Sequence, residues 1–264
     1  MKYGNLHTHS TFCDGRDTPE TLIFKALEIG FDVIGFSSHS PLQGCDNWCM
    51  SNERVELYFN EINRLKEKYK GWITVLCGVE QDYYSEEPAV FYDYVIGSVH
   101  CFNIGGKLLP VDASRDLLKK IVDEYFGGKF LNMAKAYYEL VSDVVRKTKC
   151  DIIGHFDLIT KFNKLGYFFD EESDEYLSLA FSAVDELIKT GRPFELNTGA
   201  MARGHLDRAY PAPKIIEYIK SKGGKLILTS DCHNMHFLDF GFDEYVSIAN
   251  GFTLDALKRK KRKK

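Results

Sequence analysis

Histidines and carboxylates in this sequence recur at the ends of short apolar runs, where they could bind metal ions. Two pairs are spaced one residue apart, His7 with His9 and Asp231 with His233. Side chains at positions i and i+2 of an extended segment point the same way, so each pair could converge on one ion. Imidazole and carboxylate ligands together suit zinc, iron or manganese better than magnesium or calcium. The two pairs therefore indicate a transition-metal site.

Further residues of the same types stand in comparable places. Glu80 ends one apolar run, and Asp14 follows the first histidine pair by five residues. One metal ion takes about four protein ligands, so the complete set implies more than one ion. A carboxylate such as Glu80 could bridge two ions. The candidate ligands are His7, His9, Asp14, His39, Glu80, His100, His155, Asp231 and His233.

The elements that must position these ligands alternate between strand and helix patterns. We predict strands near 2–7, 33–38, 73–80, 94–100, 151–155, 193–198 and 225–231, and helices near 18–30, 52–70, 113–148, 172–190 and 211–222. Alternation of this kind predicts a parallel sheet with right-handed crossovers, and about seven units favour a closed or nearly closed barrel. The carboxyl ends of the strands in such a barrel meet on one face, where active sites are built.

The first predicted turn argues against the main alternative fold. An open nucleotide-binding sheet usually carries a glycine-rich turn after its first strand. Here that turn reads His7-Thr8-His9-Ser10. The sequence therefore favours a barrel with a metal site over a dinucleotide-binding sheet.

Length and charge narrow the class of protein and of partner. The 264 residues are ordinary for a single α/β barrel, so we expect one domain over 1–264. The segment 258–264 contains only Lys and Arg, and we expect a solvated, frayed tail there. Without it, 27 basic residues stand against 38 acidic ones, a net charge of −11. A chain with this negative net charge does not resemble a nucleic-acid binder.

The cysteines and the N-terminus bear on cellular location. The seven cysteines are odd in number and scattered without a CxxC pair, which favours reduced thiols over a disulfide framework. The segment 1–6 lacks the basic-then-apolar layout of a secretory signal. No apolar run approaches the roughly 20 residues needed to cross a membrane. We expect a cytoplasmic protein with no membrane partner.

The motifs resemble those of the PHP (polymerase and histidinol phosphatase) family. The similar segments are Leu6-His7-Thr8-His9-Ser10 with Cys13-Asp14-Gly15, Gly35-Phe36-Ser37-Ser38-His39, Gly78-Val79-Glu80, His100, His155 and Asp231-Cys232-His233. They occur in the family's order from residue 6 to residue 233. One departure is Ser38, where many members carry Asp, but this position is not a ligand in the family scheme. The resemblance implies a distorted (β/α)7 TIM-like barrel that carries three divalent metal ions, zinc, manganese or iron.

The resemblance also implies how the ligands divide and what the protein does. By analogy, His7, His9, Glu80 and Asp231 hold one ion, Glu80, His100 and His155 hold the second, and Asp14, His39 and His233 hold the third. Similarity is greatest to the stand-alone histidinol-phosphate phosphatases, which share Ser38-His39-Ser40-Pro41-Leu42 and Gly154-His155-Phe156-Asp157. This likeness implies a phosphomonoesterase that hydrolyses L-histidinol phosphate to L-histidinol and phosphate in histidine biosynthesis.

The expected chemistry assigns further roles. Clustered divalent ions lower the pKa of a bridging water, so we expect a metal-bridging hydroxide as nucleophile, with Glu80 bridging two ions. Asp231 or His233 would protonate the leaving group. Phosphate needs cationic side chains with several donors. The candidates for binding it are Arg16, Lys161, Arg203 and His205. Asp157 or Glu195 could bind the substrate ammonium.

Three alternatives remain open. A second kind of PHP phosphoesterase would act on nucleotides or other small phosphate esters. A degenerate barrel could serve as a metal-binding sensor, although the complete ligand set argues against it. A metal-dependent amidohydrolase would usually carry a bridging lysine after the fourth strand, where this chain has His100.

Overall fold

Seven short parallel strands form the centre of the molecule. The computed structural model describes residues 4–45 and 47–249. Neighbours in the sheet follow sequence order, as right-handed crossovers predict. The strands are β1 (Gly4–Asn5), β2 (Val33–Phe36), β3 (Thr74–Asp82), β4 (Tyr94–Ser98), β7 (Ile152–Ile153), β8 (Phe194–Asn197) and β9 (Leu226–Thr229). Each lies within about two residues of a predicted strand.

The sheet curls until its first and last strands meet beyond their carboxyl ends. Thr8 and Cys232 form a parallel bridge there. The amide of His9 donates to the Cys232 carbonyl at 2.8 Å, and the amide of Cys232 donates to the His7 carbonyl at 3.1 Å. The barrel is thus nearly closed, and its seam lies at the carboxyl rim. This architecture confirms the predicted (β/α)7 barrel.

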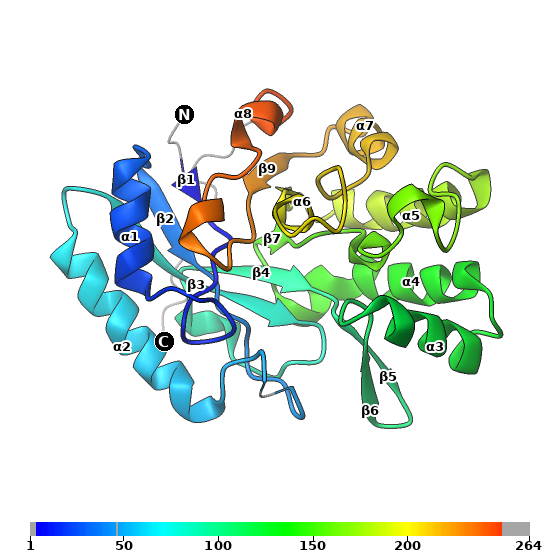
Figure 1. Ribbon diagram of the computed structural model, residues 1–264, viewed down its shortest axis with the longest axis horizontal. Helices are drawn as coiled ribbons and strands as arrows, with labels where there is room; N and C mark the ends of the chain where they lie inside the picture. The colour runs from blue at the N-terminus through cyan, green and yellow to red at the C-terminus, as the bar shows by residue number, and fades with distance from the viewer. Residues whose placement is uncertain (1–3, 46, 250–264) are drawn as a thin grey trace.

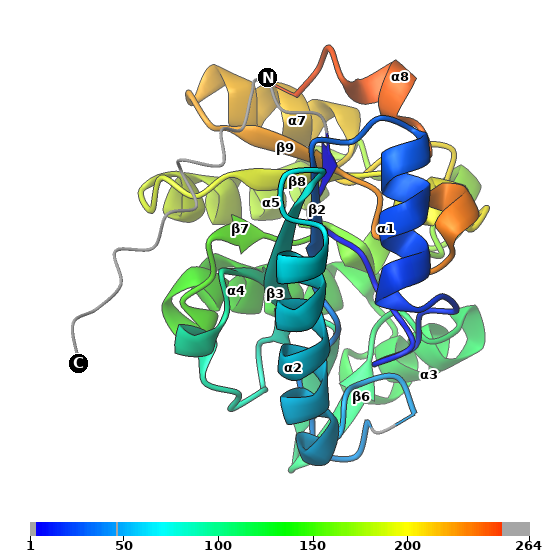
Figure 2. The ribbon, with the colours of Figure 1, turned by 90° about the vertical axis from the view of Figure 1, so that its left-hand side faces the viewer.

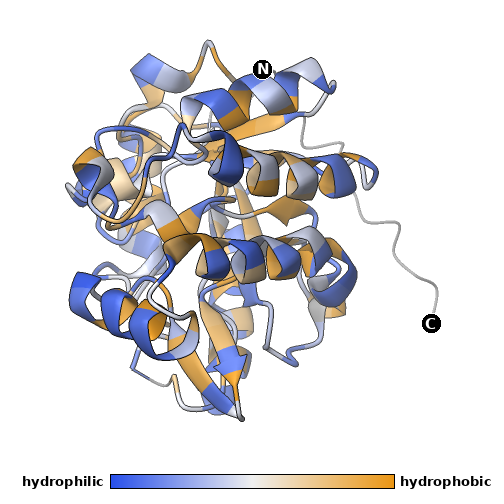
Figure 3. Cartoon of the chain, turned by 90° about the vertical axis from the view of Figure 1, so that its right-hand side faces the viewer, coloured by the Kyte–Doolittle hydropathy of each residue, from blue (hydrophilic) through white to orange (hydrophobic). Residues whose placement is uncertain are grey.

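Helices surround the strands, with α1 and α2 over β2 and β3 and with α4 and α5 packed together on the opposite side (Figures 1 and 2). The strands are mostly hydrophobic, and the helices carry polar residues on their outer faces (Figure 3). The main helices are α1 (Pro19–Glu28), α2 (Asn52–Lys68), α3 (Arg115–Tyr125), α4 (Phe130–Thr148), α5 (Asp174–Ile188) and α7 (Pro213–Ser221). Short helices are η1 (Ala89–Phe91), η2 (Leu158–Thr160), η3 (Lys164–Gly166), α6 (Gly199–Ala202), η4 (Met235–Phe237) and α8 (Phe242–Tyr245).

Two segments differ from the prediction. The helical pattern over 113–148 is two helices, α3 and α4, because Gly127 and Gly128 adopt φ values of 65° and 71°. A two-stranded antiparallel sheet, β5 (Cys101–Ile104) and β6 (Lys107–Pro110), follows β4 and extends away from the barrel (Figure 1). The Gly105-Gly106 turn, with φ values of 61° and 83°, joins the two strands, and such a glycine pair is a hairpin signal in a sequence.

Two other expectations concern the termini and the membrane. The predicted basic tail at 258–264 lies outside the described residues. Within the described part of the chain, no helix combines the length and the apolar character that crossing a bilayer requires.

Tyr94 ties the interior of the barrel together. Its hydroxyl, on β4, donates to the carbonyl of Leu6 and lies 3.2 Å from the carbonyl of Phe36. The ring needs space that two motif glycines provide. A Cβ on Gly35 would lie 2.4 Å from the Tyr94 hydroxyl oxygen, and a Cβ on Gly78 would lie 2.2 Å from its Cζ. These glycines are therefore packing residues rather than turn residues.

We predict that Tyr94→Phe lowers the free energy of unfolding by about 1 to 3 kcal/mol, because buried carbonyl groups lose their donor. Urea unfolding would measure the change. Tyr167→Phe is the matched control, since its ring is 56% exposed. Equal stability of the Tyr94 variant and the wild type would contradict the assigned role of the hydroxyl.

Candidate metal centre

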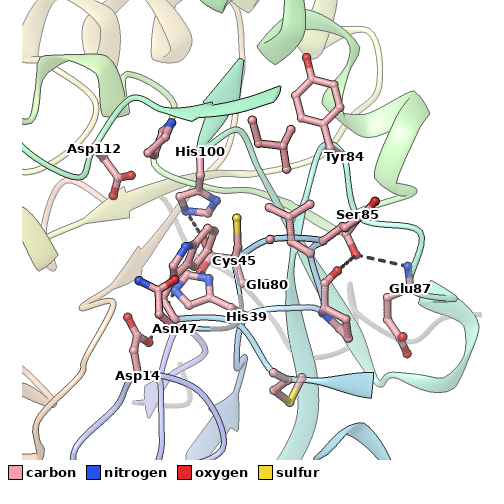
Figure 4. Close-up of a pocket in the computed structure, with 18 of the residues that line it drawn as sticks. Asp14, His39, Cys45, Asn47, Glu80, Tyr84, Ser85, Glu87, His100 and Asp112 are labelled. Atoms are coloured by element: carbon pink, nitrogen blue, oxygen red, sulfur yellow. Dashed lines mark hydrogen bonds and ion pairs between the residues drawn. The ribbon is translucent and has the colours of Figure 1, made fainter. Parts of the chain in front are cut away.

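The structure brings the predicted metal ligands together at the carboxyl rim of the barrel. His7 and His9 follow β1, His39 follows β2 and His100 follows β4, while Glu80 lies within β3. In Figure 4, Asp14, His39, Glu80 and His100 gather at the floor of one cavity. His155 follows β7, and Asp231 and His233 follow β9. The strand-end pattern in the sequence thus corresponds to one cluster in space.

Glu80 lies at the centre of this cluster. Its Oε2 is 2.9 Å from Nδ1 of His39 and 3.2 Å from Nε2 of His7. Its Oε1 is 2.8 Å from Nε2 of His155 and 3.3 Å from Nε2 of His100. Each carboxylate oxygen therefore faces a different set of imidazoles. A carboxylate placed in this way can bridge two ions.

Among the described residues, three groups of side chains have ligand atoms within 4.8 Å of one another. They are His9, Asp14, His39 and His233; His7, His9 and Glu80; and His39, Glu80 and His100. The predicted sets share these residues but divide them differently, since His9 and His39 each belong to two groups here. Asp231 lies beside the second group, with its Oδ1 3.2 Å from Nε2 of His9. The assignment of each ligand to one ion stays a prediction.

Buried polar atoms without partners support the fit of this cluster to metal ions. Nε2 of His7, Nε2 of His9 and Oε2 of Glu80 are shielded from solvent and form no hydrogen bond of suitable geometry among the described residues, although ligand atoms lie 2.9 to 3.4 Å away. A buried polar atom left unpaired costs free energy and needs an explanation. All three atoms belong to one candidate ligand group, so a divalent cation would satisfy them together.

Carboxylates behind the cluster orient two of the imidazoles. Glu195, on β8, lies with Oε1 2.6 Å from Nδ1 of His7. Its Oε2 accepts from the His155 amide at 2.9 Å and from Nδ2 of Asn197 at 3.1 Å. Asp82 lies 3.2 Å from Nδ1 of His100. An imidazole whose Nδ1 donates to a carboxylate presents the Nε2 lone pair to an ion.

These orienting roles change the interpretation of two acidic residues. Glu195 is fully buried and bonded to three donors, so it is not available to a substrate ammonium. Asp157 is also fully buried, lies 3.4 Å from Arg208 and accepts from the Ala212 amide at 2.9 Å. Neither is among the described residues that line the cavity. A carboxylate between two apolar residues of a predicted strand, Glu195 between Phe194 and Leu196, was the available sequence signal for an orienting role.

Electrostatics keep two carboxylates of the cluster ionised and the His9 imidazole neutral. Burial and the neighbouring His233 and His39 lower the pKa of His9 to about 3, so its lone pair is free at neutral pH. Burial opposes ionisation of Glu80, but His7, His39 and His100 hold its pKa well below the usual value. The pKa of Asp231 is also well below its usual value, because Arg203 and His7 outweigh the effect of burial. Both carboxylates are therefore ionised.

A cavity of about 1780 Å³ opens above the cluster, and two of the four predicted phosphate-binding residues line it. Arg203 places Nη2 3.0 Å from Asp231 Oδ2, and Lys161 places Nζ 3.0 Å from Asp112 Oδ2. His205 packs against Phe162 instead, with ring centroids 5.5 Å apart. The side chain of Arg16 is exposed, and neither Arg16 nor His205 is among the described lining residues.

Comparison with known proteins agrees with this site. The family model described as "PHP domain" matches residues 5–199, which include seven of the nine candidate ligands. This chain belongs to the PHP family.

Known proteins match most of the chain, in sequence and in structure. A curated relative from Schizosaccharomyces pombe, named probable histidinol-phosphatase, is 29% identical over 260 residues, covering 87% of this chain and 80% of its own. A crystal structure from Listeria monocytogenes matches with a TM-score of 0.81 at 23% identity and covers 91% and 99% of the two chains.

A second solved structure carries ligands. It is the histidinol phosphate phosphatase of Lactococcus lactis subsp. lactis, complexed with zinc, L-histidinol and phosphate. It matches with a TM-score of 0.68 at 22% identity, covering 92% of this chain and 91% of that chain. At this identity, both structural matches establish the PHP barrel fold.

The buried contacts of Glu195 predict that this residue supports metal binding by holding His7 in place. In Glu195→Gln, one carboxylate oxygen becomes an NH2 group, which cannot accept a hydrogen bond. This group would face either Nδ1 of His7 or the two donors from His155 and Asn197, so in both cases the support of the His7 imidazole is weakened. We expect a loss of about 10- to 100-fold in metal affinity, the scale for orienting groups behind metal ligands. Competition with a chelating dye would measure it. Glu186→Gln, on the exposed face of α5, is the control, and an equal effect of both variants would refute the orienting role.

Proposed function

We propose that this chain is a metal-dependent phosphomonoesterase that hydrolyses L-histidinol phosphate to L-histidinol and phosphate in histidine biosynthesis. The observation that carries the proposal is the buried cluster around Glu80, whose unpaired ligand atoms lie at the floor of a cavity that Arg203 and Lys161 also line. The choice of histidinol phosphate as the substrate is supported by the name of the Schizosaccharomyces pombe relative. The ligands bound in the Lactococcus lactis structure support it too.

We infer that three divalent ions, zinc, manganese or iron, bind at the rim. The ligands would be His7, His9, Glu80 and Asp231 for one, Glu80, His100 and His155 for another, and Asp14, His39 and His233 for the third. When bound, such ions activate water and neutralise charge on the phosphoryl oxygens. Glu80 keeps two of these positions adjacent, because its two oxygens face different imidazoles.

The protein's own groups bind the ester and move a proton. Arg203 is held in place by Asp231, since Nη1 donates to the Asp231 carbonyl at 3.1 Å and Nη2 contacts the carboxylate. Its guanidinium is thereby directed to the cavity, where it would bind phosphoryl oxygens, together with Lys161. Of the two predicted donors, Asp231 is ionised because its pKa is well below the usual value, so we assign proton donation to the leaving alkoxide to His233. The His233 side chain is 25% exposed, so it can exchange protons with solvent.

A second candidate function is favoured by the size of the cavity. Pockets for small ligands are usually about 300 to 1,000 Å³. The cavity here, at about 1780 Å³, has room for a larger ester. A PHP phosphoesterase acting on nucleotides or other phosphate esters is therefore the alternative.

Steady-state rates decide between the two functions. We expect kcat/KM with histidinol phosphate to exceed that with p-nitrophenyl phosphate and with nucleoside phosphates, in the presence of manganese or zinc. A value for histidinol phosphate no better than that for p-nitrophenyl phosphate would rule out the histidine-pathway function. A preference for a nucleotide would establish the alternative.

We predict that Glu80→Ala lowers kcat/KM by about 10²- to 10³-fold or more, the scale for loss of one preorganised electrostatic contact at a reaction centre. The variant should also bind fewer ions, which elemental analysis would detect. Glu67→Ala on the exposed face of α2 is the matched control. Full metal content and activity in the Glu80 variant would refute the bridging role.

A further inference from the structure

Asp112 is a carboxylate in the active-site cavity that the proposed metal chemistry does not use. It follows the β5–β6 hairpin, and the amide of the preceding Val111 donates to the His100 carbonyl at 2.8 Å. This bond fixes Asp112 beside a candidate metal ligand, as Figure 4 shows. Its side chain is 25% exposed, so it is shielded but can be reached from the cavity.

The present partner of Asp112 is Lys161. The Lys161 Nζ lies 3.0 Å from Asp112 Oδ2 and donates to the Asp112 carbonyl at 2.8 Å. Lys161 follows η2 and lines the same cavity as His155, so we expect its ammonium to reach the proposed phosphoryl position. Two opposite charges thus neutralise each other on the cavity wall. A ligand that supplies the opposite charge to each partner can replace this pair without leaving either charge alone.

The other carboxylates of the cavity are less suited to bind a cation. Asp14, Glu80 and Asp231 belong to the proposed metal centre. Among the remaining described lining residues, Glu53 and Glu86 are exposed to solvent, which weakens ion pairs.

Glu87 already has a partner, since it accepts a hydrogen bond from the Tyr92 hydroxyl at 3.1 Å.

Burial raises the pKa of Asp112, but Lys161 and His100 lower it to about 2, so this side chain is an ionised carboxylate at neutral pH. Asp112 is therefore the shielded acid that stands next to a phosphate-binding cation.

We propose that Asp112 binds the ammonium group of a 2-aminoalkyl phosphate while Lys161 turns from Asp112 to the phosphoryl oxygens. This inference rests on the proposed function and names the group that selects its substrate. In such an ester only two carbons and the ester oxygen separate the amine from phosphorus. A dipolar ligand of that size matches two oppositely charged partners 3.0 Å apart, because each end replaces one half of the existing pair.

The exchange gives the site a selection rule. An ester without the amine would draw Lys161 away and leave the Asp112 carboxylate partly buried without a cation. A shielded charge that loses its partner is unfavourable, so the site disfavours that ester. Asp112 is thus a specificity residue for esters that carry an amine beside the phosphate.

Matched substrates test this rule in the metal-loaded, full-length enzyme. The first pair is histidinol phosphate and its analogue without the amine, 3-(imidazol-4-yl)propyl phosphate. We expect wild-type kcat/KM to favour the amine by roughly 10-fold or more. Asp112→Asn should bring this ratio close to one, because a preference of about 10-fold is the scale for a hydrogen bond to a charged group. Asp112→Glu should retain part of it. Asp116→Asn, an exposed acid on α3, should leave the preference unchanged.

Two results would overturn the proposal. One is a wild-type enzyme that hydrolyses both members of the pair equally, which needs no variant to observe. The other is an Asp112→Asn enzyme that loses rate on both members in equal proportion, because Asp112 would then only support Lys161. Circular dichroism checks that the variant folds, and Asp112→Glu replaces it if it does not.

A second substrate pair separates this proposal from the proposed function. If histidinol phosphate is no better than p-nitrophenyl phosphate, the proposed function fails. O-phosphoethanolamine and ethyl phosphate then serve as the matched pair, and their ratio in wild type and Asp112→Asn still tests amine recognition. A ratio near one in the wild type counts against Asp112.

Discussion

Glu80 carries a negative charge into the rim of the barrel, where its side chain is only 1% exposed. A buried carboxylate is unfavourable unless cations or hydrogen-bond donors surround it. Here imidazoles from several strand ends face its two oxygens, and Ser98 donates to Oε1 at 2.7 Å. The strands must therefore meet at this one point. The parallel bridge between His39 and Glu80 shows that the backbone, too, is drawn together there.

The same requirement explains what lies behind the cluster. His7 and His100 turn Nε2 toward the cluster, and on the other side of each ring Nδ1 lies beside a carboxylate, Glu195 and Asp82 respectively. The orienting acids in turn need donors, which Asn197 and backbone amides supply. The buried charge of Glu80 thus explains why polar residues behind the candidate ligands are also buried. Arg203 extends the pattern outward, because it pairs with Asp231 at the edge of the cavity.

Residue type and strand periodicity predicted the barrel and the gathering of the ligands, because a parallel barrel brings every strand end to one rim. Features that depend on contacts between distant segments were not predictable in this way. The roles of Glu195 and Asp112 follow from neighbours dozens of residues away in sequence. Arg16 and Arg203 looked equivalent as loop cations, yet only the loop geometry places Arg203 in the cavity lining. The break at Gly127-Gly128 interrupts an apolar pattern that continues on both sides.

The seam between Thr8 and Cys232 links the proposed metal centre to the integrity of the barrel. The residues on either side of this bridge are His7, His9, Asp231 and His233, so the two edges that close the ring are also the two edges that would hold ions. Ions bound across the seam would add their binding free energy to the folded state. By thermodynamic linkage, whatever separates β1 from β9 would weaken ion binding to the same degree. Metal supply would then influence how long the enzyme persists in the cell, in addition to how fast it turns over.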